Sequence, residues 1–303
     1  MKRKQILLTN DDGILSPGLW AAAEALGALG FVTVVAPRRQ YSSAGRSLPN
    51  DSDGRIERQH LQIGTQTWEV YAVGGSPAQA VQHALLEVMP QPPDLVVSGI
   101  NYGENVGTGV TISGTVGAAL EAAAMGIPGL AVSMQLAVVE DFLSYSRSVD
   151  FSAAAHFTAQ IAERMLAAPL PPDVDVLKVE VPLGATPQTP WRITRQSRHR
   201  YYDPYPEREG DWSQPGHIRA RVNVQPGEAT PDSDVHTLYF DRLVSVTPLS
   251  LEMTSRSGHT DLRRNIISFL RECILWIVSL RGSLKSSSSS DSIRSPRRSS
   301  MPK

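Results

Sequence analysis

The sequence predicts an α/β protein in which helices cover both faces of a parallel sheet, giving a three-layer core. Apolar runs of strand length alternate with segments that carry apolar residues at helical spacing, from the start of the chain to about residue 183. Such alternation is typical of parallel sheets with crossover helices. The chain has 303 residues, of which 41% are hydrophobic and 19% charged, enough to bury a sizeable core. The expected architecture is Rossmann-like.

The first two helices of this core have recognisable starts. Ser16-Pro17 supplies an N-cap residue and an N1 proline, and Ser76 stands at the N-cap of a second helix, because side-chain oxygens and first-turn prolines favour helix initiation. Short apolar runs between polar residues and glycines predict the strands. In chain order we expect strand 6–9, helix 18–29, strand 31–36, strand 68–73, helix 77–89, strand 94–98, helix 115–125, strand 129–133, helix 151–167 and strand 174–181.

The pattern changes twice after this core, which we place at residues 1–183. Prolines and short β-like runs at 191–194, 218–224 and 243–246 predict a small antiparallel β extension with few helices over 184–254. Residues 255–303 form a divergent C-terminal tail with a helix candidate at 266–280. The tail is rich in Ser and Arg from about residue 283, a composition typical of disorder.

Composition and charge exclude several classes of protein. The 29 Lys and Arg residues nearly balance the 30 Asp and Glu residues. The chain therefore lacks the positive field that attracts nucleic acid or acidic membranes, and we expect no stable nucleic-acid partner. No apolar stretch reaches the length of a membrane span, so we expect no membrane association. The single cysteine, Cys273, cannot form an intramolecular disulfide, which fits a cytoplasmic protein.

Polar side chains follow the first predicted strand where it ends. The apolar run at residues 6–8 leads into Asn10, Asp11, Asp12 and Gly13, and open α/β sheets bind ligands beyond the carboxyl ends of their strands. Adjacent carboxylates repel each other, and a bound cation relieves the repulsion. The alternative is an ordinary Asp-Asp-Gly turn or a helix cap, although Ser16 already takes the cap position. From these residues alone, both interpretations stay open.

Three further segments are expected at the same edge of the sheet. Ser42 lies in a hydroxyl-rich loop after the second strand, and Asn101 and Asn105 follow the strand at 94–98. We expect Glu104, between them, to be solvated. A glycine- and hydroxyl-rich run then leads into a helix, whose free N–H groups can hold an anion. That run contains Ser113, Gly114 and Thr115.

Each of these segments is also compatible with ordinary loops and turns. Together they supply carboxylates, an amide, hydroxyls and an anion cradle, which are the groups needed for metal-assisted phosphoryl transfer. The seven histidines show no pair at metal-ligand spacing. A metal would therefore be held by oxygen atoms, which favours Mg²⁺ or Mn²⁺ over Zn²⁺.

At these residues the chain resembles the stationary-phase survival nucleotidases, the SurE family, over roughly residues 6–254. The motifs that carry the resemblance are Thr9-Asn10-Asp11-Asp12-Gly13, Val35-Ala36-Pro37, Ser42-Ser43-Ala44-Gly45, Gly75-Ser76-Pro77-Ala78, Ser98-Gly99-Ile100-Asn101-Tyr102-Gly103-Glu104-Asn105, Ser113-Gly114-Thr115-Val116-Gly117-Ala118-Ala119, Thr194-Arg195-Gln196-Ser197 and Val244-Ser245-Val246-Thr247-Pro248-Leu249.

The resemblance implies a phosphatase of nucleoside 5′- and 3′-monophosphates, with some activity on short polyphosphate. It implies one divalent metal ion per subunit, Mg²⁺ or Mn²⁺, and a homodimer or homotetramer assembled through the 184–254 extension. Asp11 and Asp12 would be catalytic. By the same resemblance the metal ligands would be Asp11, Asp12, Ser42 and Asn101, and the phosphate would be held by Asn105, Ser113, Gly114 and Thr115.

Two residues depart from the family pattern. Arg46 stands where many members carry histidine, and Glu180 stands where an asparagine is usual. The attacking group is left open between a water, with an aspartate as base, and direct attack by an aspartate on phosphorus. Alternative functions are a non-catalytic nucleotide-binding protein and another metal hydrolase, such as a pyrophosphatase, because one scaffold can host many chemistries.

Overall fold

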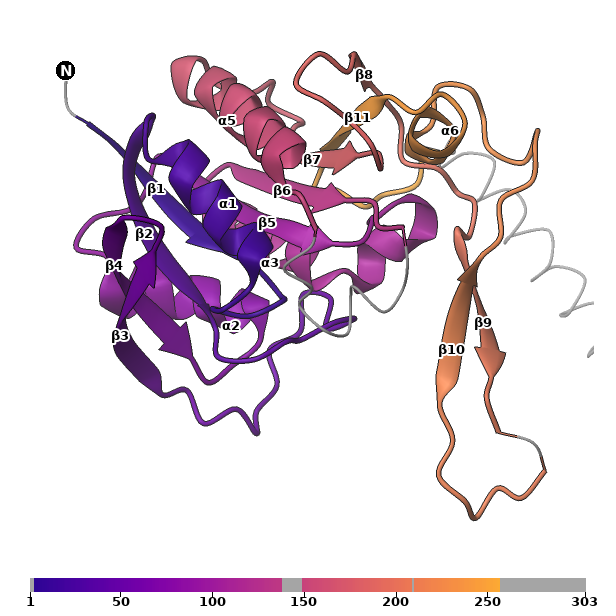
Figure 1. Cartoon of the computed structure of the whole chain (residues 1–303), viewed down its shortest axis with the longest axis horizontal. Coiled ribbons are helices and arrows are strands. Elements are labelled where there is room, and N and C mark those ends of the chain that lie inside the picture. Colours follow the sequence, from indigo (N-terminus) through magenta and orange to yellow (C-terminus); the bar gives the residue numbers. More distant parts are fainter. Residues whose placement is uncertain (1–2, 138–148, 209, 257–303) are drawn as a thin grey trace, which may run out of the picture. The chain divides into compact units, whose positions relative to one another are not determined.

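A computed structural model describes residues 3–137, 149–208 and 210–256 of the chain (Figure 1). The strands are β1 (Lys4–Thr9), β2 (Gly30–Pro37), β3 (Ile56–Ile63), β4 (Gln66–Val73), β5 (Leu95–Tyr102), β6 (Gly129–Met134), β7 (Val176–Val181), β8 (Trp191–Ile193), β9 (Tyr202–Pro206), β10 (Ile218–Val222) and β11 (Val244–Leu249). The α-helices are α1 (Pro17–Leu26), α2 (Pro77–His83), α3 (Gly114–Ala124), α5 (Ser152–Ala167) and α6 (Asp234–Tyr239), with a π-helical turn at Ala84–Val88 and a 3₁₀ helix at Gly107–Ile112.

The predicted fold class is confirmed, because most strands pair in parallel in one sheet. That sheet has nine strands in the order β3-β4-β2-β1-β5-β6-β7-β11-β8 within the described ranges. The pairs from β4 to β7 are parallel, whereas β3 and β11 run antiparallel to β4 and β7. All elements lie in one compact unit that ends at Glu252.

Helices cover both faces of the sheet, as Figure 1 shows. Side chains alternate between the faces of a strand, so Ile6 and Leu8 of β1 join the apolar cluster formed with α1 and α5. Leu7, between them, joins the cluster formed with α2 and α3. The three-layer arrangement follows from this alternation, because a parallel sheet buried on both sides needs apolar residues on both faces.

The centre of the sheet contains a topological switch point. The strands β2 and β5 lie on opposite sides of β1 and both pair with it in parallel. The connections from β1 to β2 and from β4 to β5 therefore leave in opposite directions. In open α/β sheets the ligand crevice lies beyond the carboxyl end of the strand at such a point, which here is β1. Residues 10–13 are the first to enter that crevice.

Several element boundaries differ from those predicted. The first helix ends at Leu26 rather than residue 29, and the second becomes π-helical after His83. Ser16 occupies the predicted N-cap, but its side chain makes no capping hydrogen bond, and its buried Oγ has no partner. Proline at N1 and the packing of α1 on the sheet therefore set this helix start.

The strand β3 was not predicted. Polar residues occupy positions 57–60 and 62, half of the strand is exposed and none of its residues is fully buried, so it lacks the apolar run of a buried strand. It forms because each residue from Ile56 to Ile63 pairs with β4. Long-range backbone pairing of this kind leaves little trace in local sequence.

The region after Pro182 is only partly an antiparallel extension. The β-like runs predicted at 191–194 and 243–246 fall in β8 and β11, which extend the main sheet, with β8 parallel to β11. Only β9 and β10 form a separate antiparallel pair, drawn in orange in Figure 1. Helix α6, capped by Ser233, was also missed. The boundaries at residues 183 and 254 remain a prediction.

The expectations for the tail, a helix at 266–280 and disorder from about 283, lie outside the described residues. Among the helices that are described, none combines the length and apolar character that a membrane crossing requires.

Candidate active site

The turn after β1 brings the two adjacent aspartates into the crevice. The Asn10 side chain spans this turn, because its Nδ2 donates to the Gly13 carbonyl at 3.0 Å and its Oδ1 accepts from the Gly13 N–H at 3.1 Å. Gly13 has φ +96°, and a Cβ there would lie 3.0 Å from the backbone of Arg39. Only glycine fits this conformation and contact.

Asp11 contacts the start of helix α3. The Thr115 hydroxyl donates to Asp11 Oδ1 at 2.6 Å, and a Cβ on Gly114 would lie only 2.7 Å from Asp11 Oδ2. Burial raises the pKa of Asp11 to about 6, although the Thr115 hydroxyl and the N–H groups of Thr115 and Gly114 lower it. The positive end of α3 therefore supports the ionised form of a deeply buried carboxyl.

Asp12 is held by two other strand ends. Its Oδ1 accepts from Gln40 Nε2, and its Oδ2 accepts from the Tyr102 N–H, both at 3.1 Å. Burial and the charge of Asp11 together raise the pKa of Asp12 to about 8. The pair therefore keeps one proton at neutral pH, because two ionised carboxylates would repel each other in a buried site.

Asn101 and Ser42 lie beside these aspartates. Asn101 Nδ2 donates to the carbonyls of Tyr102 and Gly103, at 3.2 and 2.7 Å, which directs the amide nitrogen toward its own loop. Ser42 lies exposed on a turn, and the residue before it, Tyr41, donates its N–H to the Asp11 carbonyl at 2.7 Å. Asn101 is therefore next in sequence to Tyr102, which binds Asp12. Ser42 is next to Tyr41, which binds the main chain of Asp11.

The donor set fits a hard divalent cation. It consists of two carboxylates, an amide and a hydroxyl, all oxygen donors. In the described ranges no three or more His, Cys, Asp or Glu side chains gather into a metal cluster. A cation here would thus be held by the two aspartates together with neutral oxygens. The raised pKa values of Asp11 and Asp12 indicate a pair that a positive charge would stabilise.

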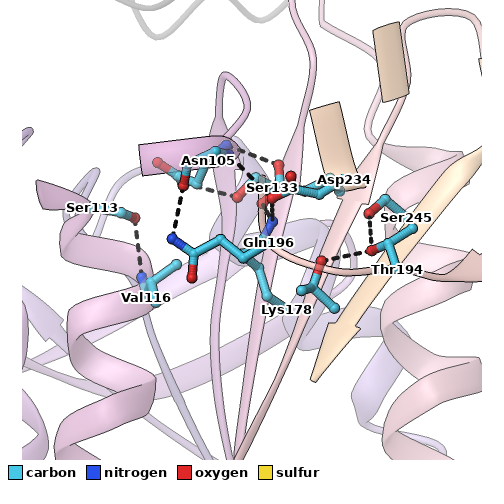
Figure 2. A network of polar contacts seen from close by, with 12 residues as sticks. Asn105, Ser113, Val116, Ser133, Lys178, Thr194, Gln196, Asp234 and Ser245 are labelled. Carbon is cyan, nitrogen blue, oxygen red and sulfur yellow. Dashed lines mark hydrogen bonds and ion pairs between the residues drawn. The ribbon is translucent and has the colours of Figure 1, made fainter. Parts of the chain in front are cut away.

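The residues expected to hold phosphate come from two adjoining segments. Ser113 caps α3, because its Oγ accepts from the Val116 N–H at 3.1 Å (Figure 2). Gly114 and Thr115 are the first two residues of α3, and both contact Asp11. Asn105 lies on the loop after β5, with its side-chain Nδ2 donating to Ser133 Oγ at 2.9 Å. The structure brings the aspartates and the start of α3 into direct contact, and Asn105 is fixed separately.

Arg46 forms an ion pair with a buried residue of α3. Its Nε lies 2.6 Å from Glu121 Oε2, and Gln82 donates to the other carboxylate oxygen at 2.8 Å. The Gly45 N–H also donates to the Ile112 carbonyl at 2.9 Å. The loop that carries Ser42 is therefore fixed to the same helix that contacts Asp11.

Glu104 is buried, contrary to the expectation that it is solvated. Only 7% of it is exposed. Tyr201 and Tyr202 hydrogen-bond to this carboxylate. Burial is the main cause that raises the pKa of both tyrosines, and the Glu104 carboxylate raises it further. The expectation was wrong because the segment after β8 folds over this loop, which local sequence does not reveal.

A buried ion cluster lies next to Asn105. Lys178 Nζ is 3.1 Å from Asp234 Oδ2 and 3.6 Å from Glu180 Oε1, and the Lys178 and Glu180 side chains are fully buried. Burial raises the pKa of Glu180 to about 7, against the lowering effect of Lys178. The sequence carried a signal for this cluster, since Lys178 and Glu180 lie two residues apart in an otherwise apolar strand and so share one face.

These features define an α/β protein with an acidic, oxygen-rich site at the switch point of a parallel sheet. The family model described as "Survival protein SurE" matches residues 6–203. The chain is 41% identical to a protein of Methanocella arvoryzae and 42% identical to one of Thermococcus gammatolerans, each named 5′-nucleotidase SurE. Both alignments cover 86% of this chain, and they cover 97% and 94% of the relatives.

A solved structure supports the same assignment. The crystal structure of the SurE protein from Aquifex aeolicus superposes with a TM-score of 0.67 at 30% identity, covering 86% of this chain and 98% of that one. The chain therefore belongs to the SurE family, as its motifs predicted.

The ion cluster leads to a prediction about stability. Burial raises the pKa of Glu180 to about 7 in the folded state, whereas the ordinary pKa of an exposed Glu is 4.5. The unfolded chain therefore releases this proton first, and stability falls as pH rises from about 4.5 to about 7. Glu180→Gln removes the effect, so the variant should gain about 3 kcal/mol relative to the wild type between pH 4.5 and 8.

Urea unfolding at several pH values measures this gain. Asp211→Asn, at an exposed carboxyl, is the control and should follow the wild type. A constant difference between Glu180→Gln and the wild type across this range would contradict a raised pKa for Glu180.

Proposed function

We propose that this chain is a divalent-metal-dependent phosphatase that hydrolyses nucleoside 5′-monophosphates to nucleoside and phosphate. The observation that carries the proposal is the contact of Asp11 with the start of α3, which puts a paired-carboxylate site directly against the first turn of a helix. The names of the relatives, 5′-nucleotidase SurE, supply the substrate class.

Asp11, Asp12, Asn101 and Ser42 would hold the cation through oxygen atoms. A divalent cation bound there would neutralise phosphate charge and lower the pKa of a nearby water. The protein itself holds the two carboxylates close to each other, so that both could bind one cation. Gln40 and the Tyr102 N–H orient Asp12, and Thr115 orients Asp11.

The phosphate would lie between Asn105 and the start of α3. The Asn105 amide has a second N–H besides the one that donates to Ser133. Residues 113–115 would complete the phosphate site, as helix N-termini do, with the Gly114 and Thr115 N–H groups shared between Asp11 and the phosphate. In the reaction, a P–O bond forms to the attacking oxygen, the P–O bond to the nucleoside breaks, and the nucleoside oxygen takes a proton. If the attacking oxygen belongs to water, that water gives up a proton as it attacks. If it belongs to an aspartate carboxylate, a water molecule then hydrolyses the acyl-phosphate, which releases phosphate and restores the carboxylate.

The remaining details of function are also proposals. Activity on 3′-monophosphates and on short polyphosphate rests on the family resemblance alone. A cytoplasmic location rests on the single cysteine and the family resemblance.

We further propose a homodimer, or a pair of dimers, assembled through β9 and β10. This antiparallel pair lies outside the main sheet. Large apolar side chains are exposed on β10, where Ile218 is 71% exposed, and in the segment between the two strands, where Trp212 is 89% exposed. Exposed apolar clusters of this kind mark interaction surfaces.

Light scattering should give a mass of at least twice 32.9 kDa for the wild type. Leu86→Asp, at an exposed residue elsewhere, should give the same mass, and Ile218→Asp should give a lower one. A monomeric wild type would exclude this assembly.

Phosphate release tests the enzymatic function. Purified protein should release phosphate from nucleoside monophosphates with Mn²⁺ or Mg²⁺ and not with EDTA. Asp11→Asn should lower kcat/KM by about a hundredfold or more, because a carboxylate charge is lost where the cation binds. Asp211→Asn should leave activity unchanged.

A folded wild type that binds Mn²⁺ but releases no phosphate from any monophosphate would favour the nucleotide-binding alternative. Release from pyrophosphate alone would favour a pyrophosphatase.

Metal binding should depend on pH. Because the pKa values of Asp11 and Asp12 are raised to about 6 and about 8, Mn²⁺ must displace a proton below pH 8. Apparent affinity should rise about tenfold per pH unit from pH 6.5 to 7.5 and level off above pH 8. Calorimetry in buffers of different ionisation enthalpy counts the released protons. Asp12→Asn should remove this pH dependence, and an affinity that is constant with pH in the wild type would refute it.

A further inference from the structure

Three buried carboxylates surround the loop that carries Asn105. Glu104 is in the loop itself, Glu180 comes from β7, and Asp234 comes from α6. Lys178 is the cation among them. Figure 2 shows Asn105, Ser133, Lys178, Gln196 and Asp234 gathered in one network of polar contacts.

Asn105 is fixed at two points. Its backbone N–H donates to Glu180 Oε2 at 2.9 Å, and its side-chain Nδ2 donates to Ser133 Oγ at 2.9 Å. The first contact sets the position of the main chain, and the second sets the direction of the amide. Above its pKa of about 7, Glu180 is ionised, and a hydrogen bond to a charged, buried acceptor is among the stronger ones available to a protein.

The next turn of the loop is fixed through Asp234. The Gly107 N–H donates to Asp234 Oδ2 at 3.1 Å, and Gln196 Nε2 donates to the Gly107 carbonyl at 3.0 Å. Asp234 Oδ1 accepts from the Ser197 N–H at 2.8 Å. Lys178 lies between Asp234 and Glu180, so one buried ammonium balances both carboxylates that hold the loop.

We propose that Glu180 is a positioning residue, which together with Lys178 and Asp234 holds the loop of Asn105 in the geometry that receives the phosphate group. This proposal rests on the proposed function for its catalytic consequence. Glu180 itself does not touch substrate and acts through the Asn105 main chain.

Because the cluster is buried, removal of the Glu180 side chain should displace the loop of Asn105. Charged groups leave water at a cost that only pairing and hydrogen bonding offset. With Glu180 absent, the Asn105 N–H would be buried without an acceptor, and the loop would shift to reach water or another partner. A glutamine retains an acceptor at the same position, so it should hold the loop where alanine cannot.

A double-mutant cycle tests the proposal. Glu180→Ala should lower kcat/KM for a nucleoside monophosphate about tenfold, and Glu180→Gln should stay within about threefold of the wild type. Asn105→Ala should lower kcat/KM strongly. The pair Glu180→Ala with Asn105→Ala should be no worse than Asn105→Ala alone, because Glu180 then has no side chain to position.

Ser245→Ala provides the matched control. Ser245 is buried on β11 directly opposite Glu180, but its hydroxyl contacts Thr194 and not the loop. This variant should keep wild-type kcat/KM. Effects of Glu180→Ala and Asn105→Ala that multiply, or an equal loss in Ser245→Ala, would overturn the positioning role.

Hydrogen exchange separates this proposal from the proposed function. Peptides covering residues 104–107 should exchange faster in Glu180→Ala than in the wild type or Ser245→Ala. Equal exchange rates in Glu180→Ala and the wild type would show that Glu180 does not hold the loop, regardless of catalytic activity. If the wild type releases no phosphate, the proposed function fails, and the exchange rates alone decide whether Glu180 holds the loop.

Discussion

The contact between Asp11 and the start of helix α3 is the interaction on which the site depends. Asp11 is buried next to a second carboxylate, and the charged form of such a pair is costly. The hydroxyl of Thr115 and the N–H groups of α3 offset part of that cost. The contact requires glycine at position 114, because a Cβ there would lie 2.7 Å from Asp11. Strand β1 and helix α3 must therefore be placed together before a site exists.

This constraint explains how much of the site the sequence could predict. The aspartates, Asn101 and the run at 113–115 each follow an apolar strand or precede a helix, and parallel strands end at one edge. Local pattern and topology together therefore place them near each other. Direct contact of Thr115 with Asp11 was not predictable, because it depends on how closely α3 approaches β1.

Other features depended on pairing between distant segments. The strand β3 is polar and forms only on β4, and Glu104 is buried only because Tyr201 and Tyr202 cover it. Ser16 illustrates the opposite case, where a residue type matched its position but formed no capping bond. Propensity identifies candidate positions, and tertiary packing decides which contacts form.

The two departures from the family pattern share one physical explanation. Arg46 pairs with the buried carboxylate of Glu121, and Glu180 faces the buried ammonium of Lys178. Each changed residue has a partner of opposite charge within the described structure. Breaking one member of such a pair would leave an uncompensated buried charge, so each pair is best regarded as a unit that supports a loop of the site.

The segment that follows β8 links the loop of Asn105 to the β9–β10 pair. Gln196 and His199 contact the loop directly, because Gln196 donates to the Gly107 carbonyl and the His199 carbonyl accepts from the Thr108 N–H at 3.1 Å. Ser197, between them, donates its N–H to Asp234. Tyr201 and Tyr202 then cover Glu104, and Tyr202 is already the first residue of β9. The segment that leads into the proposed dimer contact therefore also covers the loop of Asn105, which is proposed to bind phosphate. The start of β9 and the loop after β5 are thus joined by hydrogen bonds that lie outside the core sheet.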